Sequence, residues 1–193
     1  MSRPLADLLS AYQPHDAAEA ADLPRIRAIA GAAADPWSRS SPLHLTGSAV
    51  IVHPATGRVL LRWHERQGAW LQVGGHGDPG ESDPLQITLR EAREETGLAD
   101  LVPWPDPALV HAVIVSVPAR GDEPAHEHAD LRFVLATSDP AAARPEHESA
   151  PLRWLTMDEA RAVTAEDNLR ETLDRVARLL PAAQQAQRGI PAG

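Results

Sequence analysis

One segment near the middle of the chain restricts the fold more than any other, because it joins an irregular loop to a helix with defined ends. The loop, residues 74–80, reads Gly-Gly-His-Gly-Asp-Pro-Gly, and its glycines and proline exclude regular structure. Asp83 then offers an N-cap, Pro84 suits the first helical position, and Gly97 supplies a C-terminal stop. The sequence therefore predicts a loop followed by a helix that begins at Pro84.

This helix carries three glutamates on one face. Relative to Glu91, the side chains of Glu94 and Glu95 point at about 300° and about 40° on an ideal helix. Two unit charges about 4 Å apart repel by on the order of 4 kcal/mol at an effective dielectric near 20. A hard divalent cation such as Mg²⁺ offsets that repulsion, so the face predicts a metal site. The alternative is a solvated face whose charge is relieved by Arg90 and Arg93.

The loop and helix together resemble the Nudix box, whose pattern is G-x5-E-x7-R-E-U-x-E-E-x-G-U with U an aliphatic residue. The ordered matches are Gly75, Glu81, Arg90, Glu91, Glu94, Glu95, Gly97 and Leu98, with Ala92 as a small residue at the first aliphatic position. One departure is that eight residues, 82–89, stand between Glu81 and Arg90 where the pattern has seven. An extra residue before the helix does not change which face of the helix the three glutamates occupy. It affects only whether Glu81 can contact Arg90 and the metal.

The resemblance implies an α/β fold, a Nudix-type α/β/α sandwich around a mixed β-sheet. It also implies an Mg²⁺-dependent hydrolase, with Mn²⁺ as an alternative ion, that cleaves the diphosphate linkage of a nucleoside diphosphate derivative by attack of water on phosphorus. Metal ligands would be the Gly75 carbonyl, Glu94, Glu95 and Glu91, and Glu91 is also a candidate general base. Arg90 would orient the carboxylates, and Gly74 and Gly75 would lie against the substrate.

Two rival functions follow from the same resemblance. Isopentenyl diphosphate isomerase resembles Nudix proteins but employs a cysteine, and this chain has none. The other rival is a non-catalytic regulator that binds a nucleotide or metabolite on a Nudix fold. Such regulators usually show eroded boxes, whereas the glutamates are intact here.

Composition narrows the partners. The formal net charge of −9 argues against strong binding to nucleic acids or anionic membranes, and a small nucleotide is the expected partner. The absence of cysteine removes disulfides, thiolate metal sites and thiol nucleophiles. Asp7 interrupts the apolar residues near the start, so neither a signal peptide nor a membrane span is predicted, and a cytoplasmic enzyme is expected.

The chain is expected to divide into an N-terminal helical extension with its linker (1–41), a Nudix hydrolase domain (42–181) and a flexible tail (182–193). The extension has apolar residues at helical spacing in two stretches, and the linker around 35–42 contains two prolines. Whether these helices form a homodimer interface or shape a pocket is left open. Strands are expected at 45–52, 58–63, 70–73, 111–117, 131–137 and 152–155, with a last helix at 168–180. Thr156 and Glu159 form a capping-box pattern.

Several residues outside the box are further candidates. Glu148 precedes the strand at 152–155 and is predicted to add a catalytic carboxylate, ahead of Glu146. Arg62 is predicted to meet substrate phosphate, as is Arg66, although solvated arginines are commoner.

Histidines and tryptophans supply the remaining candidates. His126 and His128 alternate toward a strand, so their side chains project on one side and could bind a transition metal. No third or fourth ligand stands at a diagnostic spacing, which favours surface or substrate contacts instead. Trp63, Trp70 and Trp104 could stack on a base, but packing is the better explanation for each.

Overall fold

The computed structural model describes residues 4–32 and 35–188, and it describes side chains as far as residue 180. Its helices are α1 (Leu5–Ala11), α2 (Ala17–Ala30), α3 (Pro84–Thr96), α4 (Met157–Val163) and α5 (Asp167–Arg188), with a 3₁₀ turn at Pro140–Ala142. Its strands are β1 (Leu43–His53), β2 (Arg58–His64), β3 (Ala69–Leu71), β4 (Val73–Gly75), β5 (Val102–Pro103), β6 (His111–Val117), β7 (His126–Ala136) and β8 (Leu152–Leu155).

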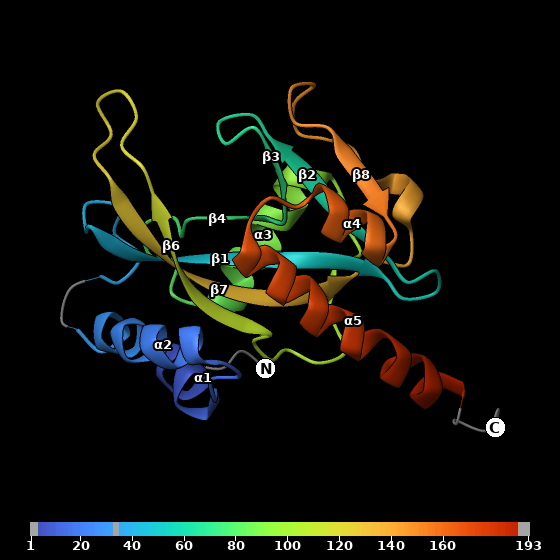
Figure 1. Ribbon diagram of the computed structural model, residues 1–193, viewed down its shortest axis with the longest axis horizontal. Coiled ribbons are helices and arrows are strands. Elements are labelled where there is room, and N and C mark those ends of the chain that lie inside the picture. The colour runs from blue at the N-terminus through green and yellow to red at the C-terminus, as the bar shows by residue number, and fades with distance from the viewer. Residues whose placement is uncertain (1–3, 33–34, 189–193) are drawn as a thin grey trace.

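The strands form one mixed sheet, as predicted. Its central path runs β3-β2-β1-β7-β5, with β4 also paired to β1, β6 to β7 and β8 to β2. The β1–β7 pair is parallel and the other pairs are antiparallel. The predicted hairpin between β1 and β2 is present, with Val52 opposite Val59. Long β1 therefore lies at the centre and carries pairing partners on both sides (Figure 1).

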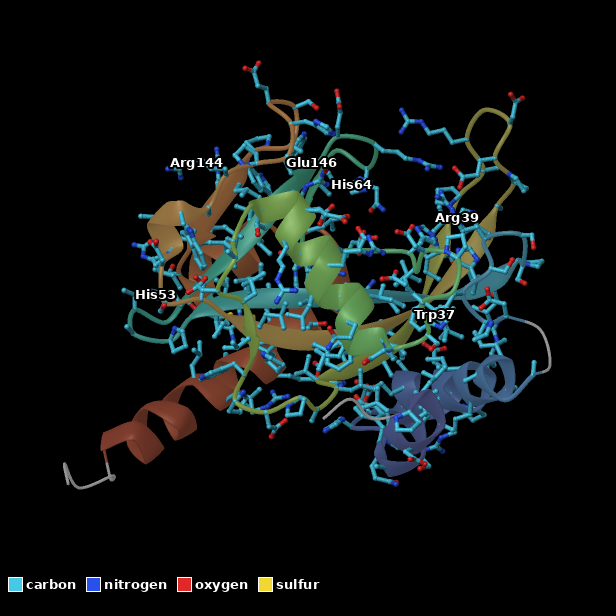
Figure 2. The ribbon with its side chains drawn as sticks, turned by 180° about the vertical axis from the view of Figure 1, so that it is seen from behind. Trp37, Arg39, His53, His64, Arg144 and Glu146 are labelled. Carbon is cyan, nitrogen blue, oxygen red and sulfur yellow. The ribbon has the colours of Figure 1, made fainter. Side chains whose placement is uncertain are left out.

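Helices cover both faces of this sheet, because the side chains of β1 alternate between two cores. Ala49 and Ile51 pack in a core that includes Ile87 of α3, whereas Val50 packs in a second core that includes Leu173 of α5. Figures 1 and 2 show the two faces, with α5 in front of the sheet in the first view and α3 in front in the second. The predicted α/β/α sandwich is confirmed.

The N-terminal helices share the core on the α3 side. Leu9, Leu23 and Ile26 are almost completely buried there. Trp37, in the segment expected to be a linker, is 3% exposed and belongs to the same core. The extension therefore packs against the main domain through α1, α2 and Trp37.

Buried ionic contacts also hold the extension in place. Glu19 of α2 accepts hydrogen bonds from the backbone N–H groups of His15 (2.7 Å) and Ala112 (3.1 Å) and pairs with Arg175 of α5 at 2.8 Å. The Tyr12 hydroxyl also donates to this carboxylate. One buried acid thus links α2, β6 and α5.

Some predicted boundaries were wrong. β7 begins at His126, so the expected loop at 121–128 is shorter than predicted. The single strand expected at Trp70–Val73 is instead two strands, β3 and β4, which are separated by Gln72. α5 continues to Arg188, so the part of the expected tail at 182–188 is helical, while residues 189–193 lie outside the described residues.

No helix in the described ranges combines enough length and hydropathy to cross a bilayer.

Candidate active site

Both ends of α3 are determined by local chemistry. The Asp83 carboxylate accepts hydrogen bonds from the backbone N–H groups of Leu85 (3.0 Å) and Gln86 (3.4 Å), and Pro84 follows it. Gly97 ends the helix with φ of 67°, a left-handed conformation that suits glycine, and its N–H donates to the Arg93 carbonyl at 2.8 Å. The predicted caps are confirmed, and they fix which face the glutamates occupy.

Arg90 connects the loop to the helix. Its guanidinium donates to Glu81 Oε2 (2.9 Å), Glu91 Oε1 (3.0 Å), Glu94 Oε2 (3.0 Å) and the His76 carbonyl (2.8 Å). The extra residue before the helix therefore does not prevent Glu81 from reaching Arg90. Hydrogen bonding to Arg90 also lowers the pKa of Glu81. The Arg90 guanidinium therefore holds the carboxylates of Glu81, Glu91 and Glu94 in fixed positions relative to one another.

Glu91 and Glu95 approach the backbone of the glycine loop closely. Glu95 Oε2 accepts a hydrogen bond from the Gly74 N–H at 2.9 Å. A Cβ placed on Gly75 would lie 2.6 Å from Cδ of Glu91, so only glycine leaves room for that carboxyl group. Glu94 is more open, with its side chain 53% exposed against 17% for Glu91 and 13% for Glu95.

The donor set of this site fits a hard divalent cation. Burial raises the pKa of Glu95 to about 7, against the opposing effects of the Gly74 N–H and Arg62. Burial also raises the pKa of Glu91. Burial thus disfavours the charge of both carboxylates despite their contacts with Arg90 and Arg62, and the carboxylates offer oxygen atoms, which Mg²⁺ and Mn²⁺ prefer. The roles of Glu91, Glu94, Glu95 and the Gly75 carbonyl as ligands stay predictions.

Arg62 lies between two acids at the edge of the site. Its Nη1 is 3.1 Å from Glu95 Oε1, and its Nη2 is 3.5 Å from Glu146 Oε2. Its Nε is buried and has no hydrogen-bond partner within the described structure. Glu146 thus contacts Arg62, while Glu148, the favoured candidate, lies two residues further on and is exposed as Glu146 is, so its catalytic role stays a prediction. Figure 2 shows the Glu146 loop beyond one end of α3.

A polar pocket adjoins the glycine loop. It is lined by Gly74 and Gly75 together with Thr46, Ser48, Gln72, His128, Asp130, Arg132 and others. Asp130 organises this wall by accepting hydrogen bonds from Ser48 Oγ (2.8 Å) and Arg132 Nε (2.7 Å). Gln72 Oε1 is buried and has no partner among the described residues. Gln72 would have to turn its Oε1 toward the pocket to accept a hydrogen bond from a ligand.

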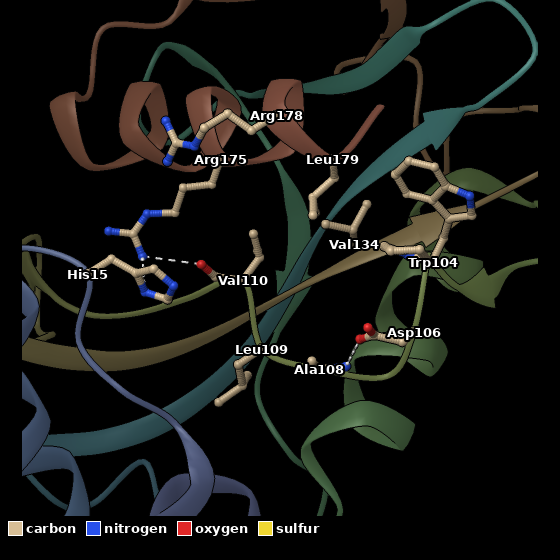
Figure 3. A pocket seen from close by; sticks show the side chains of 11 residues that line it. His15, Trp104, Asp106, Ala108, Leu109, Val110, Val134, Arg175, Arg178 and Leu179 are labelled. Atoms are coloured by element: carbon tan, nitrogen blue, oxygen red, sulfur yellow. Dashed lines mark hydrogen bonds between the residues drawn. The ribbon is translucent and has the colours of Figure 1, made fainter. Parts of the chain in front are cut away.

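The tryptophans do not gather at this site. Trp63 and Trp70 pack edge to face, 5.5 Å between ring centroids, on neighbouring strands, and Arg153 lies 4.6 Å over Trp70. Trp104 lines a separate pocket with Val134 and Leu179, and that pocket contains no box residue (Figure 3).

Arg66 is engaged elsewhere. It forms an ion pair with Glu123 in the loop before β7. Phosphate binding by Arg66 would require this pair to open, so Arg62 is the better placed of the two arginines.

The arrangement defines a class of protein: an α/β/α fold that presents carboxylates from a capped helix beside a glycine loop. A NUDIX domain model matches residues 43–178, and the chain therefore belongs to the Nudix family. It is a Nudix-type hydrolase, as the resemblance implied. No protein of curated function matches the sequence.

Solved structures agree on the fold. The chain is similar to an Ap4A hydrolase from C. elegans in a binary complex (20% identity, TM-score 0.57, 72% of this chain and 98% of the other). It is also similar to the E. coli dihydroneopterin triphosphate pyrophosphohydrolase (22% identity, TM-score 0.55, 70% and 94%). At these identities the similarity concerns the fold.

Proposed function

We propose that the chain is an Mg²⁺-dependent hydrolase that cleaves the diphosphate linkage of a nucleoside diphosphate derivative. The observation that carries this proposal is the convergence of Glu91 and Glu95 on Gly74 and Gly75, with Arg90 linking Glu91 to Glu94. Glu91, Glu94, Glu95 and the Gly75 carbonyl would hold Mg²⁺, which when bound neutralises charge that develops on the phosphoryl oxygens.

The residues around these carboxylates have separate tasks. Arg90 keeps Glu91 and Glu94 at fixed distances from the loop, so that they need not reorganise during the reaction. Arg62 can turn from Glu146 to a substrate phosphate, because that ion pair is long and partly open to solvent. Glu91, which is less exposed than Glu94, is the candidate general base for the attacking water.

The polar pocket is the candidate site for the part of the substrate beyond the diphosphate. An unpaired buried acceptor costs about 1–3 kcal/mol, so a ligand that donates an N–H or O–H to Gln72 Oε1 regains that free energy. Nucleobases and sugars carry such donors. Both named structural neighbours are described as acting on phosphorylated compounds, which supports testing dinucleotides and triphosphates beside nucleotide sugars.

The test is Mg²⁺-dependent product formation from a panel of nucleotide sugars, dinucleotides and nucleoside triphosphates. Glu95→Gln and Glu94→Gln should each lower kcat/KM by about 100-fold, because each removes a charged ligand while keeping the side-chain shape. Glu65→Gln, an exposed change of equal charge, should leave kcat/KM unaltered. Full turnover in the Glu94 and Glu95 variants would refute the proposal. Folded protein that binds nucleotides but cleaves none would identify a regulator instead.

A further inference from the structure

Four histidines gather beside the glycine loop. His44 of β1 and His128 of β7 are direct partners in the parallel register, and His126 lies on the same side of β7. His76 joins them from the loop that follows β4. The Nε2 atoms form a chain in which His44 and His76 are 3.1 Å apart, His76 and His128 3.2 Å, and His128 and His126 3.1 Å.

Hydrogen bonds alone do not account for these three contacts. His44 Nδ1 lies 2.9 Å from the Ser41 carbonyl and His126 Nδ1 lies 3.0 Å from the Pro124 carbonyl, so both donate there. In a neutral ring Nε2 then carries a lone pair and no proton. The three contacts need three protons, but only His76 and His128 can each supply one from Nε2. Protonating His76 or His128 adds a proton only at Nδ1, and a further Nε2 proton would require a charged ring at His44 or His126 inside the cluster.

A cation among the rings removes this conflict. Each Nε2 would direct its lone pair at the ion, and no proton would be needed between the rings. Zn²⁺ binds imidazole at about 2.0–2.1 Å, so two ligand atoms of a tetrahedral site are about 3.3 Å apart. One ring nitrogen from each of His44, His76 and His128 lies within 4.8 Å of the other two, and the two Nε2 separations that involve His76 are 3.1 and 3.2 Å. Two of the three separations thus match those of a tetrahedral site.

The rings are also in the state that binds metals. Burial lowers the pKa of His76 to about 3 and that of His128 to about 4, and it lowers the pKa of His44 as well. Burial therefore favours the neutral form of these rings, which is the form that binds a metal ion. Ligating histidines usually donate the other ring N–H to a carbonyl or carboxylate, and the contact between His44 and Ser41 has that form.

We propose that His44, His76 and His128 form a binding site for a divalent transition-metal ion of the Zn²⁺ type, distinct from the Mg²⁺ site on α3. His126 stands beside the fourth position, with Nε2 3.1 Å from that of His128. Neutral imidazoles favour Zn²⁺ over Mg²⁺, which prefers oxygen ligands and retains its waters. The site thus uses different chemistry from the carboxylates nearby.

The ion would hold the glycine loop in place. His76 belongs to that loop, and its carbonyl accepts a hydrogen bond from Arg90 at 2.8 Å. His44 and His128 belong to β1 and β7, the parallel pair at the centre of the sheet. Binding would therefore hold the loop against β1 and β7 and, through His76, position Arg90 and its glutamates.

The test is titration of the chelator-stripped full chain with Zn²⁺ in competition with a chromogenic chelator, in excess Mg²⁺. One equivalent of Zn²⁺ should bind, and His76→Ala and His128→Gln should each weaken binding by about 100-fold or more. His53→Ala, which removes a histidine at the other end of β1, should bind as the unaltered protein does. Circular dichroism establishes that each variant is folded, and His76, on a partly exposed loop, is the safer change.

A second probe identifies the ligands. Co²⁺ in place of Zn²⁺ should give the visible absorption of a tetrahedral, nitrogen-rich site, and His76→Ala should abolish it. Glu94→Gln and Glu95→Gln should retain the Zn²⁺ stoichiometry. The proposal is overturned if the stripped chain takes up less than one equivalent, if the histidine variants retain full affinity, or if the glutamate variants lose the ion.

Discussion

Replacing Gly75 by alanine tests whether the position of Glu91 matters for turnover. The new Cβ would lie 2.6 Å from Glu91 Cδ and 2.7 and 2.8 Å from its two carboxylate oxygens. Carbon atoms in ordinary contact are about 3.5 Å apart, so the carboxyl group must retreat by about 0.9 Å. That movement also disturbs the 3.0 Å contact between Glu91 and Arg90.

Gly75→Ala should lower the rate of turnover and leave the stability of the fold almost unchanged. A misplacement of about 1 Å in a catalytic group lowers the rate by about 100-fold, so kcat/KM should fall by that factor. The backbone at Gly75 does not have positive φ, and the atoms that must move are the end of a flexible side chain. Alanine also reduces the entropy of the unfolded chain. The free energy of unfolding should therefore change by less than about 1 kcal/mol.

The assay compares kcat/KM and urea unfolding for Gly75→Ala and Gly77→Ala. A Cβ on Gly77 would meet Ile87 Cδ1 at 3.0 Å and the Trp37 ring at 3.3 Å, which are apolar contacts away from the carboxylates. This control should lose about 1 kcal/mol of stability and keep its activity. Wild-type kcat/KM in Gly75→Ala would refute the reasoning, and so would equal losses of activity in the two variants.

Two ion-pair networks give predictions of different kinds. Burial alone raises the pKa of Glu19, but hydrogen bonds, of which that from Arg175 is the strongest, lower it from 4.5 to about 2. Because the pKa is lowered, the contribution of the Glu19 carboxylate to stability is full above pH 4.5 and is lost as the pH falls toward 2. In Glu19→Gln the urea midpoint should therefore depend less on pH over that range. An unchanged pH dependence would contradict the assignment. Arg62→Lys keeps the charge but loses the planar fork that reaches Glu95 and Glu146, so KM for a diphosphate substrate should rise about 10-fold, or about 1.4 kcal/mol. An unchanged KM would remove Arg62 from substrate binding.

Local signals predicted the elements that depend on local chemistry. Asp83, Pro84 and Gly97 define the ends of α3 through contacts within a few residues, and each was recognisable from its type. Thr156 and Glu159 form the predicted capping box for the same reason. By contrast, α2 and α5 are joined through Glu19, and an ion pair between residues so distant in the chain has no local signature.

The choice between Glu146 and Glu148 shows the same limit. Both are acids in one loop, and sequence position favoured Glu148. The pairing of β8 with β2 brings the loop to Arg62, and the path of the loop places Glu146 at the ion pair, although both acids are exposed. A difference of two residues in a loop depends on tertiary packing and not on residue type.

The sequence alone determined the Nudix box, because a capped helix sets the angles among Glu91, Glu94 and Glu95 without help from the rest of the chain. Only the tertiary structure decided that His44, His76 and His128 meet. Their spacing in the chain matches no metal motif, and the alternation of His126 and His128 indicated two ligands at most. The parallel register of β1 and β7 brings His44 beside His128, and the turn after β4 adds His76, so a site assembled across strands becomes visible only when the sheet is formed.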